Sequence, residues 1–171
     1  LVLIRGFNTA YTMGASSDGL PLFSASHGSG PYGAVRSNLL TAADLSETTL
    51  EDALVTIMGA TDPRGLKINL MPQQLVTAPA NSFNARRILG SELQNDTAHN
   101  AINVLKADGS LPGGNSVYNY LTDADAWFIT TSVNAAGEGL ICYDAWGVEY
   151  GLDSDFDSFN MKVRASERYS F

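Results

Sequence analysis

The sequence predicts an α+β fold, and three observations support this prediction. Four apolar residues recur at the spacing of one helix face: Leu50, Leu54, Ile57 and Met58. Near the end of the chain four apolar residues alternate with polar ones, as in a β-strand that buries one face: Phe159, Met161, Val163 and Ala165. Between them, a short strand followed by a helix is expected at residues 74–90, which indicates a mixed layer of helices and strands.

Composition and charge exclude several classes of protein. The 171 residues include 44% hydrophobic ones, enough to form a folded core, and no apolar run reaches the length of a membrane span. The net charge of −8 disfavours tight, general binding of nucleic acid. Cys142 is the single cysteine, so no internal disulfide framework is expected. The apolar start at Leu1 without an initiator Met leads us to expect that the chain begins inside a longer protein.

The first part of the chain is expected to be a helix end followed by a long loop. A helical stripe is predicted over residues 1–13, before Gly14. Residues 14–38 are rich in Gly, Ser and Pro and are expected to form an ordered loop. Because loops of this length in a compact domain are usually functional or held by a neighbour, this one is a candidate for contact with another subunit.

The clearest predicted helix spans residues 48–58. Thr48 and Glu51 are expected to form its capping box, and Gly59 and Pro63 to end it. A strand at residues 74–77 should then lead into a helix that begins near Pro79 and ends at Gly90.

The second half is expected to consist mainly of strands. Residues 91–116 are polar and give no clear pattern, although residues 101–105 fit a strand or a short helix. Later elements are expected in this order: a strand at 117–121, a turn at 123–125, a strand at 127–131, a hairpin turn at 137–139 leading into a strand at 140–143, and a final strand at 159–166.

The motifs that could form a catalytic, cofactor or metal site lack the residue spacing or the neighbouring elements that such a site requires. Residues 28–33 match G-x-G-x-x-G but lack the strand before and the helix after that a dinucleotide site needs. The two histidines, His27 and His99, stand in no metal-binding spacing. Asp153, Asp155 and Asp157 resemble the start of a calcium loop, but the turn glycine and the bidentate glutamate are absent, which leaves at most a weak divalent-ion site at a subunit contact. We therefore predict no catalytic, cofactor or metal site and no enzymatic activity.

Several segments, in order, give the chain its resemblance to a known family. They are LFSASHG at 22–28, LVTAP at 75–79 leading into ARRIL at 85–89, LTDADAWF at 121–128, and DSFNMKVRA at 157–165. Together they resemble the Mu-like major head subunit of tailed phages, over nearly the whole chain.

The resemblance implies the tailed-phage major capsid fold, which encapsulin compartments also use. It implies that residues 1–43 contain the end of the spine helix and a loop of the peripheral lobe. Residues 44–150 would form mainly the axial lobe, and residues 151–171 a returning strand of the peripheral lobe. The resemblance also implies that the N-terminal arm, the extended loop and most of the spine helix would lie before Leu1 and are absent from this sequence.

The expected function is that of a major capsid subunit in the virion, made in the host cytoplasm. Copies would assemble as hexamers and pentamers into an icosahedral shell around double-stranded DNA, bound without sequence specificity. Scaffold, portal or decoration proteins are further expected partners, and no cofactor or membrane is expected. Asp157, Arg164 and Arg168, beside the final strand, are the predicted subunit contacts.

Three other functions remain open at this point. The first is an encapsulin-like compartment shell that holds protein cargo. The second is a small hydrolase that uses Ser26, His27 and an acid such as Asp18. The third is a monomeric module that binds carbohydrate or protein.

Overall fold

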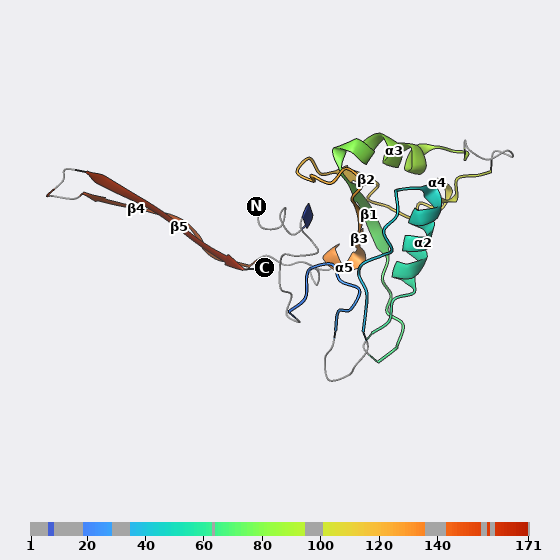
Figure 1. Cartoon of the computed structure of the whole chain (residues 1–171), viewed down its shortest axis with the longest axis horizontal. Coiled ribbons are helices and arrows are strands. Elements are labelled where there is room, and N and C mark those ends of the chain that lie inside the picture. Colours follow the sequence, from blue (N-terminus) through green and yellow to red (C-terminus); the bar gives the residue numbers. More distant parts are fainter. Residues whose placement is uncertain are drawn as a thin grey trace. The chain divides into compact units, whose positions relative to one another are not determined.

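The structure, a computed structural model, describes residues 7–8, 19–28, 35–62, 64–94, 101–135, 143–154, 157 and 160–170. The chain consists of two compact units, Leu1–Ser132 and Val133–Phe171. Figure 1 labels the elements. The first unit contains α2 (Glu47–Met58), β1 (Pro72–Thr77), the 3-10 helix η1 (Pro79–Asn81), α3 (Ser82–Gly90), α4 (Val104–Ala107), β2 (Asn115–Val117) and β3 (Trp127–Thr131). The short α5 (Ser132–Ala135) follows β3, and the second unit contains β4 (Tyr143–Ser154) and β5 (Met161–Ser170). This mixture of helices and strands confirms the predicted α+β class.

A three-stranded sheet, with the order β2-β1-β3, is the centre of the first unit. β1 runs parallel to β2 and antiparallel to β3. The strands predicted at 74–77 and 127–131 are confirmed as β1 and β3. The strand predicted at 117–121 is wrong in its bounds, because β2 ends at Val117. Beyond it, the Tyr118 amide still donates to the Thr77 carbonyl, and the Leu121 amide then turns back to the Tyr118 carbonyl.

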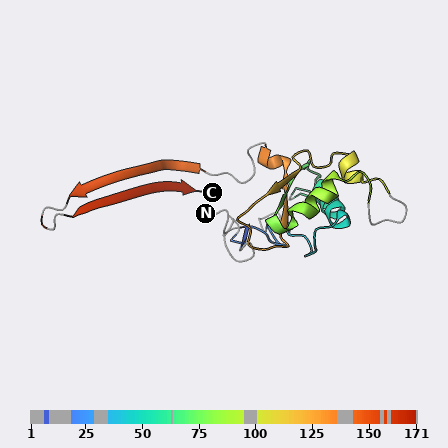
Figure 2. The same cartoon turned by 90° about the horizontal axis from the view of Figure 1, so that it is seen from above.

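One face of this sheet packs against the helices (Figure 2). Leu75 in β1 and Leu50 in α2 are both fully buried. The buried apolar cluster is formed by Leu45, Leu50, Leu54, Leu75, Ala85, Leu105 and Leu111. Removing these side chains from water is the main source of stability for this unit.

The predicted helix at 48–58 is confirmed as α2, but its predicted cap is wrong. The N-cap is Ser46, whose side chain accepts a hydrogen bond from the Thr49 amide, while the Thr49 hydroxyl accepts one from the Ser46 amide. The capping box therefore begins two residues before Thr48, because Ser46 is the last residue with extended backbone before the helix. The strand-to-helix succession near Pro79 is also confirmed, as η1 followed by α3.

Aromatic residues cover the other face of the sheet. Val76 and Phe128 are direct neighbours in the ladder, one residue along from the buried Leu75, so they stand on the opposite face. Phe128 contacts Phe7 and Phe23 with ring centroids 5.0 and 5.1 Å apart. Next to Phe7, the Asn8 side chain donates to the Tyr120 carbonyl and accepts from the Thr122 amide. Phe7 and Asn8 are the described part of the helix predicted at 1–13; the rest lies outside the described residues.

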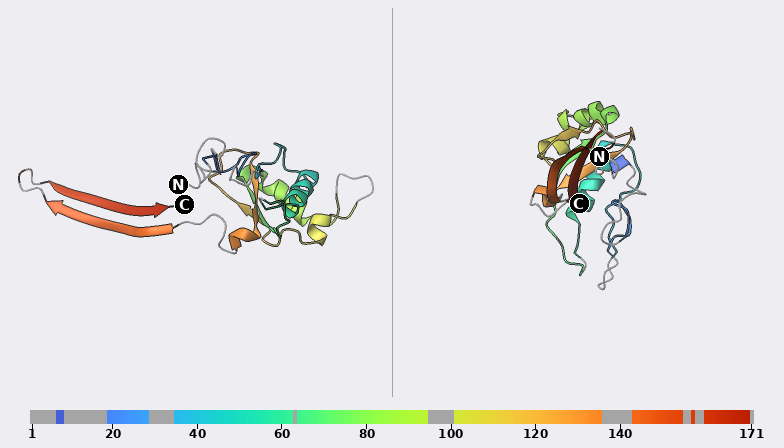
Figure 3. Two further views of the ribbon diagram at one scale, coloured as in Figure 1. Left: turned by 90° about the horizontal axis from the view of Figure 1, so that it is seen from below. Right: turned by 90° about the vertical axis from the view of Figure 1, so that its left-hand side faces the viewer.

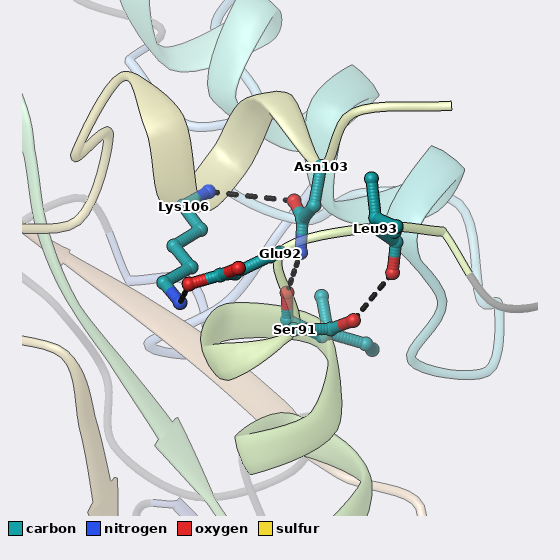
Figure 4. Close-up of polar contacts among 6 residues, drawn as sticks. Ser91, Glu92, Leu93, Asn103 and Lys106 are labelled. Atoms are coloured by element: carbon teal, nitrogen blue, oxygen red, sulfur yellow. Dashed lines mark hydrogen bonds and ion pairs between the residues drawn. The ribbon is translucent and has the colours of Figure 1, made fainter. Parts of the chain in front are cut away.

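Buried Asn103 connects α3 with α4 (Figure 4). Its side-chain amide donates to the Ile88 carbonyl near the end of α3, and its side-chain oxygen accepts from the Lys106 amide in the first turn of α4. Lys106 also pairs with Glu92, 3.5 Å away. The two structures proposed for 101–105 both occur in part, because Ile102 forms a bridge with Leu93 and α4 begins at Val104.

The second unit contains a two-stranded antiparallel sheet, β4 with β5 (Figure 3). The predicted hairpin that would pair residues 127–131 with 140–143 is wrong: β3 pairs with β1, and Tyr143 pairs with Ser170. Its turn at 137–139 and Cys142 lie outside the described residues. The final strand is confirmed, as Met161–Ser170.

We predict that Asn103→Ala lowers the free energy of unfolding by about 1–3 kcal/mol, because it removes a helix cap and leaves the Ile88 carbonyl without this buried donor. Urea unfolding followed by circular dichroism measures this loss. The control is Asn69→Ala, at an exposed position outside the helices and strands, which should change stability by less than about 0.5 kcal/mol. Equal losses in both variants would contradict the role given to Asn103.

Candidate assembly surface

The β4–β5 hairpin exposes a row of large apolar side chains. Residues opposite each other in an antiparallel pair stand on the same face. Tyr150 pairs with Ala165, Leu152 with Val163, and Ser154 with Met161. Within the chain, Tyr150 is 76% exposed, Leu152 72%, Met161 73% and Val163 66%. We call this row the apolar face of the hairpin.

The prediction that the final strand buries one face is therefore wrong within its own unit. The alternation of apolar and polar residues is present in β5, but residues 161–169 are all exposed. The physical reason is that two strands form a single layer. Burial needs a second layer packed on the apolar face, and the unit that contains the hairpin, Val133–Phe171, has no other strand among its described residues.

The opposite face of the hairpin carries most of its charged side chains. Here Asp153 pairs with Lys162, Gly151 with Arg164, and Glu149 with Ser166. The Arg164 side chain lies over Gly151, where an added Cβ would be in ordinary van der Waals contact, 3.5 Å from the Arg164 Nε. Trp146 pairs with Arg168 and lies between two shifts of register in β4, one on the side of Asp144 and one on the side of Glu149. We call this side the charged face.

The structure describes all three predicted contact residues. Arg164 and Arg168 lie four positions apart on the charged face of β5. Asp157 is exposed and lies in the sequence between β4 and β5. Sequence reasoning missed the contribution of β4, although Val148, Tyr150 and Leu152 alternate with Glu149, Gly151 and Asp153, the same signal that identified the final strand.

Both long edges of the hairpin are open in the described part of the chain. β4 and β5 pair only with each other, so each has one row of backbone N–H and C=O groups without a neighbouring strand. A two-stranded hairpin is marginally stable in water by itself. Such a surface is suited to binding another protein surface, through the backbone at its edges and the side chains on its faces.

The alternative based on Ser26 and His27 receives little support from their described contacts. The Ser26 hydroxyl lies 3.3 Å from the Ser24 hydroxyl, and the His27 Nε2 lies 3.2 Å from the Leu22 carbonyl oxygen. Because a carbonyl only accepts hydrogen bonds, this contact requires a proton on Nε2, so Nε2 is not the basic nitrogen in this arrangement. Asp18, the proposed acid, lies outside the described residues.

The described residues show no cluster that would hold a metal ion, since no three His, Cys, Asp or Glu side chains gather there. Of the three aspartates that resemble a calcium loop, Asp155 is outside the described part. Among the described helices, none has the length and apolar character needed to cross a membrane.

Comparison with known proteins identifies a family for the chain. The family described as phage capsid protein matches residues 3–169, which is nearly the whole chain. A search of curated proteins found no match, and a search of solved structures found none either.

We predict that backbone amides of β4 and β5 exchange with deuterium at least about tenfold faster than those of β1 in the dispersed subunit, because no described side chain of the hairpin is fully buried. Hydrogen exchange with mass spectrometry measures this difference. Leu75 and its neighbours in β1 serve as the internal reference, since Leu75 is fully buried. Protection of β5 equal to that of β1 would show that the hairpin is stable without a covering partner.

Proposed function

The chain belongs to the phage capsid protein family, and from this membership we propose that it is a major capsid subunit of the virion. In this proposal, copies of the chain assemble into an icosahedral shell that encloses double-stranded DNA. The observation that carries this proposal is the exposed hairpin: its apolar face gives each subunit a surface that a neighbour can cover. Large exposed apolar surfaces on a soluble protein typically mark sites of protein association.

We propose the tailed-phage capsid fold for this chain, in the Mu-like form that its sequence resembles. In this assignment residues 1–43 contain the end of the spine helix and a peripheral-lobe loop, residues 44–150 form mainly the axial lobe, and residues 151–171 return to the peripheral lobe. The family match, which extends from residue 3 to residue 169, supports an assignment over the whole chain.

A shell subunit must meet several neighbours, so it needs more than one contact surface. Specific interfaces typically bury more than about 1,000 Å² in total. Besides the hairpin, α2 and the segment after it expose a series of large apolar side chains: Val55, Met58, Leu66, Ile68 and Met71. Many modest contacts of this kind, acting together, close a shell of hexamers and pentamers. Scaffold, portal or decoration proteins are further partners in this proposal.

The net charge of −8 is compatible with a shell that encloses DNA without binding it tightly. An acidic protein is repelled by phosphate at long range, so packaged DNA would be retained by enclosure and not by sequence-specific contacts. In the proposed cycle the subunit is made in the cytoplasm of the bacterial host and ends in the virion.

We propose Asp157, Arg164 and Arg168 as subunit contacts. Arg164 and Arg168 share the charged face of β5, and Asp157 is exposed in the sequence between the two strands. An arginine can bind a neighbour's carboxylate through two parallel hydrogen bonds, which fixes the relative orientation of two copies. Charges of this kind contribute mainly to the specificity and rate of association, while the apolar face supplies the larger area removed from water.

We predict that the protein sediments as closed particles of uniform diameter from lysates of cells in which the phage is growing. Electron microscopy of the sedimented fraction, together with nuclease treatment, tests shape and content. Particles that protect double-stranded DNA support the proposal. Particles that hold a resident protein in place of DNA would identify a compartment shell, and a chain that stays monomeric beside the phage's other head proteins would refute assembly.

We predict that Arg164→Glu lowers the yield of sedimenting particles by about tenfold, because it places an acid where the neighbour's acid is expected. Arg86→Glu is the matched control: it makes the same change of charge at an exposed position of α3, and its yield should stay within about twofold of the unmodified protein. Circular dichroism checks that both variants fold. An unchanged yield for Arg164→Glu would remove this residue from the contact.

A further inference from the structure

The two strands of the hairpin differ strongly in charge. β4 contains three acidic residues and no basic one: Asp144, Glu149 and Asp153. β5 contains three basic residues, Lys162, Arg164 and Arg168, against one acid, Glu167. Each strand also forms one open edge of the two-stranded sheet. The hairpin therefore has an acidic edge and a basic edge.

This arrangement distinguishes two ways in which copies could meet. If two copies met through the same edge, as in a two-fold symmetric contact, β5 would lie beside β5 and basic residues would face basic residues. If the β4 edge of one copy met the β5 edge of the next, acidic residues would face basic ones. Cross-strand pairs of opposite charge stabilise a sheet, whereas like charges directly opposite each other destabilise it.

We propose that the β4 edge of one copy pairs with the β5 edge of a second copy, so that hairpins of successive subunits form one continuous antiparallel sheet. This inference rests on the proposed shell function and names one of its contacts. The pairing is head-to-tail, the class of contact that closes into rings when the rotation between copies allows it.

Edge pairing would also place the apolar faces of neighbouring hairpins on the same side of the sheet. Acids and bases meet across the new edge when both hairpins keep their charged faces on one side, because side chains on one face of a sheet contact each other across strands. Leu152 and Val163 of successive copies then join into one wide apolar surface. The open backbone groups of each strand gain partners in the same step.

Two double variants test the proposal. Glu149→Lys with Asp153→Lys makes the β4 edge basic, and Lys162→Glu with Arg164→Glu makes the β5 edge acidic. Each variant alone then has two edges of the same sign, so the yield of sedimenting particles should fall about tenfold or more in both. A symmetric contact through one edge predicts a different result, since one of the two variants would keep the edge that it uses and would assemble normally.

Co-expression of the two variants, each with its own tag, gives the decisive result. The basic β4 edge of one variant then meets the acidic β5 edge of the other. In a ring of six every edge contact can join opposite charges, and in a ring of five all but one can, so we expect particle yield to recover with both variants incorporated. All four substitutions in one chain should also restore assembly. If the single chain with four substitutions assembles but the mixture does not, the charges act inside each hairpin, through pairs such as Asp153 with Lys162, and the proposal is wrong.

A control separates this proposal from the proposed function. Arg86→Glu with Arg87→Glu replaces two basic residues of α3 by acids, the same change of charge as in the β5 variant, and should leave particle yield unchanged. If the unmodified protein forms no particles with the phage's other head proteins, the shell function itself fails. If the unmodified protein and all variants form particles equally well, the shell function stands and only the edge contact is refuted.

Discussion

The β4–β5 hairpin is a single layer of sheet, and this limits the stability that it can reach without a covering surface. A sheet becomes stable when at least one of its faces is covered, and two strands cannot cover themselves. The hairpin nevertheless carries Tyr150, Leu152, Met161 and Val163 on one face, each more than half exposed within the chain. Removing side chains of this size from water lowers the free energy of the protein. We therefore expect the apolar face of the hairpin to be covered by a surface outside its own unit.

In the first unit, by contrast, residues of the same unit cover both faces of the sheet. Leu75 faces the helices and is fully buried, while Phe128 on the other face packs against Phe7 and Phe23. Asn103 holds the end of α3 to the start of α4 through buried hydrogen bonds. A unit whose sheet is covered on both faces can fold before assembly, whereas the hairpin is expected to reach its full stability when a neighbour covers it.

Local patterns were sufficient to predict α2, β1, α3, β3 and β5, but not β4, the bounds of β2 or the pairing of the strands. Helical spacing at Leu50 and Leu54 located α2, and alternation near Met161 located β5, because both signals come from neighbouring residues. The parallel pairing of β1 with β2 joins residues far apart in the sequence, such as Leu75 with Asn115 and Thr77 with Val117, and no local pattern specifies it. Arg164 and Arg168 could be selected as contacts from their positions, but alternation says only that two faces differ. It does not say what covers the apolar one, so burial of that face by residues of its own unit was wrongly expected.

A reconstruction of the assembled particle by electron cryo-microscopy would show whether a neighbouring subunit covers the hairpin. We expect Leu152 and Val163 to be covered by protein in every copy of the shell and β4 or β5 to lie beside a strand of another subunit. A map in which the hairpin stands in solvent, with its apolar face uncovered and both of its edges unpaired, would rule out the role in assembly proposed for the hairpin.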